Sequence, residues 1–182
     1  MNEVRIRAAD AADARAIARV HVQAWRESYR GLVPDHVIEA LSVERNDAMW
    51  AEILAADDSS IVHVVERLGI GSDEPDIVGF GSAADARGPE LGTSAEITAI
   101  YLLDKVKRCG IGRRLLSGLL PTLAAHGHHS AGLWVLVENR DARTFYETLG
   151  ARTGPQRVVT GGPAEMHEIA YIWEHLSGFA PL

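Results

Sequence analysis

Apolar residues that alternate with polar residues, or that follow one another without interruption, predict seven β-strands along this chain. Alternation is clearest at 4–7, whereas 133–137 is almost wholly apolar, as in a strand buried on both faces. The turn-rich segment 69–75 separates two apolar runs and predicts a hairpin. The expected strands are 4–7, 61–66, 77–84, 96–103, 133–137, 157–160 and 166–173.

Apolar residues spaced by three and four positions predict helices between these strands. After Asp10 the pattern continues through about residue 23 and on toward Tyr29. Gly118 and Pro121 predict a kink or a break in the helix after the fourth strand. The other expected helices begin near Pro34, cover 46–55 and follow Asn139. This order of elements predicts one mixed α/β domain over 1–182.

The composition excludes several classes of protein. The 182 residues carry a formal net charge of -7 with a pI near 5.6, which argues against nucleic-acid binding. The single cysteine, Cys109, excludes an internal disulfide and a cysteine-based zinc site, and we expect no metal. The sequence has neither a leader-like apolar core nor an apolar run of membrane-spanning length. We therefore expect a cytoplasmic protein without a membrane partner, either a monomer or a homodimer.

The most informative motif is a basic, glycine-bearing turn between the strand at 96–103 and the next helix. The first N–H groups of a helix lack intrahelical partners and carry partial positive charge, so they bind anions. Glycines at 110 and 112 allow a tight turn and let a diphosphate approach the amides. Charge-assisted donors come from Lys107, Arg108, Arg113 and Arg114. The turn matches neither the P-loop nor the dinucleotide-binding motif, and the alternative is a solubilising surface turn.

A second motif follows the fifth strand, where Asn139 is a helix N-cap and Gly150 a helix stop. In this order the two motifs resemble the GNAT superfamily of acetyl-CoA-dependent N-acetyltransferases, over roughly residues 4–174. The family's motif is Gln/Arg-x-x-Gly-x-Gly/Ala; this chain has Lys107-x-x-Gly110-x-Gly112, so its first position departs. The resemblance implies an α/β (α+β) fold whose mixed, mostly antiparallel central sheet is splayed between the fourth and fifth strands and flanked by helices.

The resemblance also implies how acetyl-CoA would be held as a co-substrate. Pantetheine would pair with the backbone of the fourth strand, the diphosphate would bind the amides of the turn, and Asn139 would touch the pantetheine or its thioester end. From the residues alone, Asn139 is explained equally well as an N-cap. The cofactor-binding residues expected on this basis are Ile100, Tyr101, Leu102, Lys107, Arg108, Cys109, Gly110, Ile111, Gly112, Arg113, Asn139 and Tyr146.

The implied reaction is direct transfer, in a ternary complex, of an acetyl group to a primary amine of a small molecule, peptide or protein. An alkylammonium has a pKa of roughly 10 and must first lose a proton. By resemblance Glu96 is the general base, acting through ordered water, and Tyr146 is the acid that protonates the departing thiolate. The alternatives are an outward-facing strand glutamate and a core tyrosine. Lesser candidates for the base are His63, His167 and Glu168.

The acceptor would be bound by Trp25 and Tyr29, because the family builds its acceptor site from the corresponding segments. The alternative is that both are core aromatic residues of an amphipathic helix. Two other functions stay open. One is a catalytically silent acyl-CoA-binding sensor module, and the other is a nucleotide-phosphate binder unrelated to acyl transfer.

Overall fold

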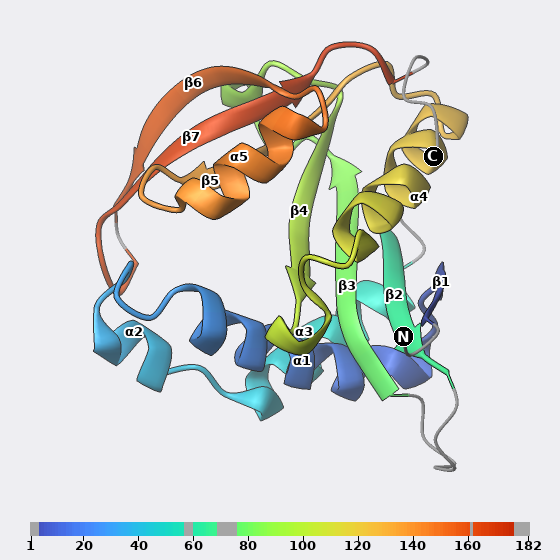
Figure 1. Ribbon diagram of the computed structural model, residues 1–182, viewed down its shortest axis with the longest axis vertical. Helices are drawn as coiled ribbons and strands as arrows, with labels where there is room; N and C mark the ends of the chain where they lie inside the picture. The colour runs from blue at the N-terminus through green and yellow to red at the C-terminus, as the bar shows by residue number, and fades with distance from the viewer. Residues whose placement is uncertain (1–3, 57–59, 69–75, 161, 177–182) are drawn as a thin grey trace.

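The computed structural model describes residues 4–56, 60–68, 76–160 and 162–176. They form a seven-stranded sheet in the order β1-β2-β3-β4-β5-β7-β6, in which every neighbouring pair is antiparallel except β4 and β5 (Figure 1). The strands are β1 (Val4–Ala8), β2 (Ile61–Arg67), β3 (Asp76–Asp85), β4 (Ala95–Leu102), β5 (Ala131–Leu136), β6 (Arg152–Val159) and β7 (Met166–Trp173).

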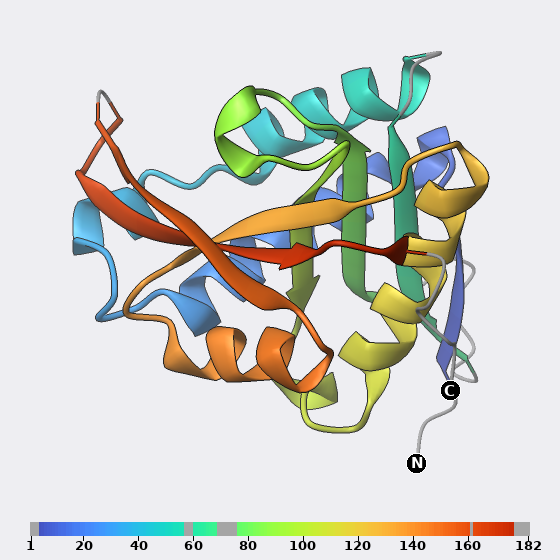
Figure 2. The same cartoon turned by 90° about the horizontal axis from the view of Figure 1, so that it is seen from above.

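Helices cover both faces of this sheet, with α1 and α3 on one face and α4 and α5 on the other (Figure 2). The α-helices are α1 (Ala14–Ser28), α2 (Asp35–Glu39), α3 (Val43–Ala55), α4 (Ile111–Ala125) and α5 (Arg140–Thr148). The 3-10 helices are η1 (Ala11–Asp13), η2 (Pro89–Leu91) and η3 (Asp104–Val106). Within the described ranges, no helix combines the length and apolar character needed to cross a bilayer.

The strand residues alternate between two cores because successive side chains point to opposite faces. Val64 packs with α1 and α3, whereas Val65 packs with the leucine-rich face of α4. In β4 a bulge breaks the alternation: β3 advances from Ser82 to Ala83 while β4 advances by two residues, so that Thr98 has no β3 partner of its own. Side chains on the two sides of Thr98 therefore reach faces that strict alternation would not give them.

The predicted fold class is confirmed, including the splay between the fourth and fifth strands. The predicted hairpin turn at 69–75 lies outside the described residues. Helix α3 starts at Val43, three residues before its predicted start, because Ser42 accepts a hydrogen bond from the Arg45 N–H. Strand β6 likewise begins at Arg152 rather than 157.

The break expected in α4 is absent, since the helix runs from Ile111 to Ala125 with Pro121 inside it. Proline removes one helical N–H donor. In the same turn the Thr122 hydroxyl donates to the Gly118 carbonyl at 2.8 Å, which adds a hydrogen bond where the proline has none. Five α4 leucines are fully buried, so packing holds the helix together across the proline.

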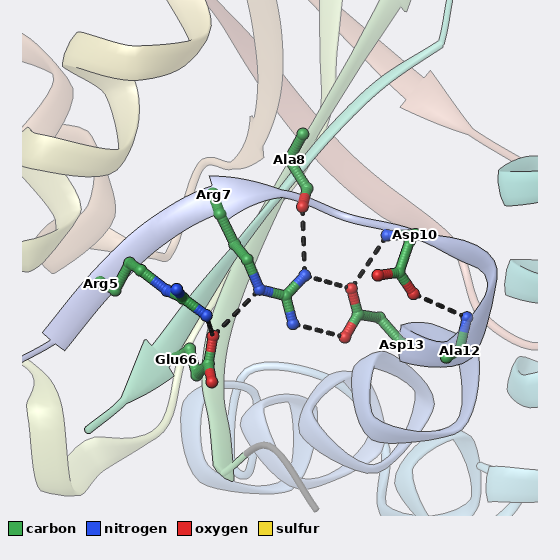
Figure 3. Close-up of polar contacts among 7 residues, drawn as sticks. All are labelled: Arg5, Arg7, Ala8, Asp10, Ala12, Asp13 and Glu66. Carbon is green, nitrogen blue, oxygen red and sulfur yellow. Dashed lines mark hydrogen bonds and ion pairs between the residues drawn. The ribbon is translucent and has the colours of Figure 1, made fainter. Parts of the chain in front are cut away.

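A buried ion pair fixes the start of the first helix to β1 (Figure 3). The Arg7 guanidinium donates to both oxygens of Asp13, at 2.6 and 2.8 Å, and to Glu66 at 3.0 Å. Asp13 is 1% exposed and also accepts the backbone N–H of Asp10. Burial acts to raise the pKa of Asp13, but the bonds from Arg7 and Asp10 outweigh it and lower that pKa below its usual value. Asp13 is therefore an ionised, fully partnered carboxylate.

We predict that Arg7→Met lowers the free energy of unfolding by about 3 kcal/mol, because it leaves the Asp13 carboxylate buried without its cation. The matched control is Arg15→Met, which breaks an ion pair with Asp47 whose arginine side chain is 54% exposed and should cost below about 1 kcal/mol. Urea unfolding at neutral pH measures both. An equal loss of unfolding free energy in the two variants would contradict the conclusion that Asp13 is a buried carboxylate stabilised by Arg7.

An aromatic cluster joins α1 to the sheet. The indole N–H of Trp50 donates to His21 Nδ1 at 3.2 Å, and the His21 ring stacks on Tyr101 with 5.1 Å between centroids. Phe80 contacts the same histidine edge-on. Burial lowers the pKa of His21 to about 4, so the ring is neutral near pH 7 and accepts at Nδ1.

The low pKa of His21 predicts a loss of stability on acidification. The unfolded chain protonates this histidine below about pH 6.5, whereas the folded chain does so only near pH 4, so unfolding becomes easier as the pH falls through that window. The difference is on the order of 3 kcal/mol. In His21→Asn, whose amide oxygen still accepts from Trp50, the acid-dependent loss should shrink by that amount in urea unfolding at pH 7 and pH 4.5. His129→Asn, which replaces an exposed histidine, is the control, and its stability should depend on pH as that of the parent protein does.

Candidate active site

The two halves of the sheet separate between β4 and β5. Their described pairing is limited to Ala95 with Ala131 and Glu96 with Gly132. Beyond Glu96, β4 continues for six more residues to Leu102 while staying paired with β3 on its other side. The edge of β4 that faces β5 therefore has backbone groups without a strand partner, and such an edge is a template for an extended ligand.

The turn after β4 and η3 leads to this open edge and exposes backbone donors. Gly110 has φ 76° and Arg108 has φ 59°, so both lie in the left-handed region. Gly110 is the N-cap of α4 and supplies no side chain, and the first turn of the helix contains no acidic residue. The first amides of α4 are thus left for an external anion. At Gly112 a Cβ would lie 3.0 Å from the Phe145 ring, so glycine lets α4 pack closely against α5.

The cations around the turn do not all face the same way. The Lys107 ammonium donates to Ser28 at 2.9 Å and pairs with Asp104 at 2.7 Å, so it holds the turn to α1. Arg114 donates to the Val4 carbonyl at 3.1 Å and is likewise occupied. Arg108 is 90% exposed and lies 3.8 Å from an equally exposed aspartate of α5. Backbone amides, rather than Lys107 or Arg114, are the donors that stay available.

Helix α5 brings two of the predicted residues beside the opening. The Asn139 side chain caps the helix by accepting the Ala142 N–H at 3.1 Å. Tyr146 is 6% exposed, and its ring packs among Phe145, Tyr171 and other aromatic side chains. Burial, and to a smaller extent the Tyr29 side chain, raise the pKa of Tyr146 well above its usual value. Its hydroxyl is protonated at neutral pH and makes no hydrogen bond within the described part of the chain.

Trp25 and Tyr29 come together at the end of α1, with ring centroids 4.5 Å apart, and both are half-buried. Tyr29 also faces Tyr101 of β4 at 6.4 Å, which places the pair beside the strand expected to receive pantetheine. The Trp25 indole nitrogen is buried and has no hydrogen-bond partner among the described groups. Burial raises the pKa of Tyr29 and of Tyr101, so both hydroxyls are neutral donors.

Glu96 is 4% exposed and bound to Arg87, a residue of the connection between β3 and β4. The guanidinium donates to Oε1 at 2.5 Å and to Oε2 at 3.0 Å. Burial acts to raise the pKa of Glu96, yet the bonds and charge of Arg87 lower it below its usual value. Glu96 also borders a pocket of about 260 Å³, whose lining includes Trp134 of β5 and Arg157 of β6.

The bulge at Thr98 explains how Glu96 and Tyr101 come to share a face. Ile97 points into the core under α4, but Tyr101 packs with the α1 and α3 core although both numbers are odd. Glu96, the neighbour of Ile97, therefore points to the same side as Tyr101. The structure thus gathers Glu96, Tyr101, Trp25 and Tyr29 on the α1 side of the opening.

The sequence pattern indicated Glu96 but none of the other residues that line the pocket, which are Arg87, Gly88, Glu90, Leu91, Trp134 and Arg157. Arg157 and Trp134 lie in predicted strands, and a cation over an aromatic ring leaves no trace in a one-dimensional pattern. Arg87 lies in a connection for which the sequence predicts no structure. Of the lesser candidates for the base, His167 is exposed beside Glu165, and His63 packs against α4 at Gly118. No cluster of metal-ligating side chains occurs within the described ranges.

Comparisons with known proteins agree with this geometry. The family model described as "Acetyltransferase (GNAT) family" matches residues 19–151. YuaI of Bacillus subtilis (strain 168), an uncharacterized N-acetyltransferase, is 28% identical over an alignment of 184 positions that covers 98% of each chain.

Two solved structures share the fold. PaiA N-acetyltransferase from Thermoplasma acidophilum, in complex with coenzyme A, superposes with a TM-score of 0.66 at 16% identity over 92% of this chain and 98% of that one. YncA of Salmonella typhimurium, with its cofactor acetyl-CoA, gives a TM-score of 0.66 at 19% identity over 98% of this chain and 96% of that one. With a family model that spans most of the sequence, the chain belongs to the acetyltransferase (GNAT) family and is an acetyltransferase.

Proposed function

We propose that the protein transfers the acetyl group of acetyl-CoA to a primary amine directly, while both molecules are bound. The observation that carries this proposal is the meeting of three features at one opening. These are the uncapped start of α4, the unpaired edge of β4 and the protonated Tyr146. The relatives crystallised with coenzyme A or acetyl-CoA support the same cofactor.

The residues of the turn fit a diphosphate. Amides from Arg108 to Arg113 surround a backbone bend in which Gly110 places no Cβ, and nothing lies within 4 Å of the position that a Cβ would take. The same bend contains Cys109, Ile111 and Gly112. Lys107 stabilises the bend by donating a hydrogen bond to Ser28 of α1. The backbone of Ile100, Tyr101 and Leu102 would pair with the two amides of pantetheine. Asn139 keeps its side-chain NH2 group for the same ligand.

When bound, acetyl-CoA supplies an acetyl thioester that a neutral amine can attack. Tyr146 is suited to give a proton to the departing thiolate, because its hydroxyl is neutral and meets no hydrogen-bond partner among the described residues. The alternative of a purely structural core tyrosine does not use that free hydroxyl. Trp25 and Tyr29 would shield the acceptor from water on the α1 side.

Glu96 is the proposed acceptor of the ammonium proton, through water. Its pair with Arg87 has two effects on that role. The carboxylate stays ionised at neutral pH and attracts a cationic amine, but the lowered pKa makes it a weak base. Loosening of the Arg87 contact would strengthen the base, and the exposed arginine side chain leaves room for that movement.

We expect Gly110→Ala to weaken acetyl-CoA binding by about tenfold. Alanine is strained at φ 76°, and relaxing the strain would turn the first α4 amides away from the diphosphate. Gly127→Ala is the matched control, since Gly127 also has a positive φ, 91°, with nothing within 4 Å of its Cβ position. Both variants should lose similar stability, but only Gly110→Ala should raise the acetyl-CoA Kd in calorimetry. If the two bind acetyl-CoA equally well, the diphosphate lies elsewhere.

For catalysis, Tyr146→Phe should lower kcat on the order of 100-fold and leave the acetyl-CoA Kd unchanged, because only the proton donor is removed. The assay is release of free thiol from acetyl-CoA over a panel of primary amines. Tyr171→Phe is the control; that hydroxyl already binds Glu147 and Arg143, and its loss should affect stability alone.

The same assay tests the proposed function as a whole. If acetyl-CoA raises the Tm but no amine of the panel increases thiol release above background hydrolysis, the result would favour the silent sensor module. ATP that competes with acetyl-CoA at similar concentration would favour the nucleotide-phosphate binder instead.

A further inference from the structure

The second half of the sheet, formed by β5, β7 and β6, has one face turned away from α4 and α5. In β5 and β7 the apolar residues Leu133, Val135 and Ile169 point into the core under α4 and α5. Their neighbours Trp134 and Glu168 must then point to the opposite face. Trp134 lines the pocket that borders Glu96, together with Gly88, Glu90 and Leu91 of the connection between β3 and β4.

Two arginine–glutamate pairs lie on this face. Arg87 binds Glu96 through two nitrogens, so that pair is complete in itself. Arg157 is different, because it uses only Nε, which donates to Glu168 at 2.7 Å. Its guanidinium lies 4.1 Å above the centre of the Trp134 ring. Glu168 and Trp134 thus hold Arg157 in place, while its two terminal nitrogens meet no acceptor in the described part of the chain.

A fixed guanidinium with two free parallel donors is a receptor for a carboxylate. Arg157 and Glu96 line the same pocket, so a carboxylate on Arg157 and an amine beside Glu96 would belong to one small molecule. The pocket volume of about 260 Å³ is below that of sites for drug-sized ligands and suits a compact acceptor.

We infer that the acceptor is a small molecule that carries both an ammonium and a carboxylate, as free amino acids do, and that Arg157 determines this specificity by binding the carboxylate. The inference rests on the proposed function and narrows its acceptor. The charged residues of the pocket lining are two arginines and two glutamates, Arg87, Arg157, Glu90 and Glu96, and this balance of charge suits a zwitterion better than a polyamine or a purely anionic acceptor. A protein N-terminus has the amine but lacks the adjacent carboxylate.

The test is thiol release from acetyl-CoA with acceptors in matched sets. Each set contains an amino acid, its primary amide and the amine without the carboxyl group, over the common amino acids. We expect the wild-type kcat/KM to favour the amino acid of the best set by at least tenfold. Arg157→Gln should raise KM for that amino acid by about 10- to 100-fold and leave KM for its amide and for acetyl-CoA unchanged.

Arg157→Lys keeps the charge but loses the bidentate donor geometry, so its KM for the amino acid should lie between those of the wild type and Arg157→Gln. Arg152→Gln is the control on the same strand, because Arg152 is 78% exposed and, among the described residues, pairs with Glu174 alone. It should keep the parental preference. A thermal shift with each amino acid and its amide, read in the absence of turnover, reports folding and acceptor binding separately from catalysis.

The outcomes separate the two proposals. Thiol release that is as fast with amides or decarboxylated amines as with amino acids would overturn the acceptor inference and leave the acetyltransferase function standing. An equal rise in KM for all three members of a set in Arg157→Gln would also overturn it, because Arg157 would then act through structure. If no acceptor gives thiol release and no amino acid gives a thermal shift, both the acetyltransferase proposal and the acceptor inference would be overturned.

Discussion

The architecture depends on how few residues join β4 to β5. The two strands are parallel, and parallel neighbours must be linked by a crossover, which here is α4. After two residue pairs the strands separate, so that one sheet has two halves that share a short seam. The separation leaves the β4 edge, the start of α4 and the aromatic side chains of α1 and α5 around one opening.

An unpaired strand edge inside a protein costs free energy unless other contacts hold its two sides in place. Here each half has its own support. On one side, α1 and α3 pack on β2 and β3 through the core that contains Val64, Phe80 and Trp50. On the other side, α4 and α5 bury leucines and Tyr146 in the core that crosses both halves. The opening persists because these cores, rather than the strand pairing, determine the separation.

Much of this arrangement could be predicted from the sequence, and the reason is local. Apolar alternation and uninterrupted apolar runs predicted the strands, and Gly110, Gly112 and Asn139 indicated two helix starts. That one ligand is shared by the two helix starts was implied by the family resemblance. What could not be predicted depends on contacts between distant residues. The pairing of Lys107 with Ser28 and of Arg157 with Trp134 joins positions far apart in the chain, and Glu96 meets Arg87 across the irregular connection between β3 and β4. Such pairs arise from the tertiary packing and have no periodic signature.

The bulge in β4 has a consequence for how this strand can vary among related chains. Thr98 separates Ile97, which points into the α4 core, from Ala99, which packs on the α1 side. Loss of Thr98 would make Ile97 and Ala99 direct neighbours, and direct neighbours in a regular strand face opposite sides, as these two already do. Every side chain of β4 would then keep its face, and only the bulge would disappear. The bulge therefore accommodates one extra residue in β4 while Glu96 and Tyr101 stay on the same side of the sheet.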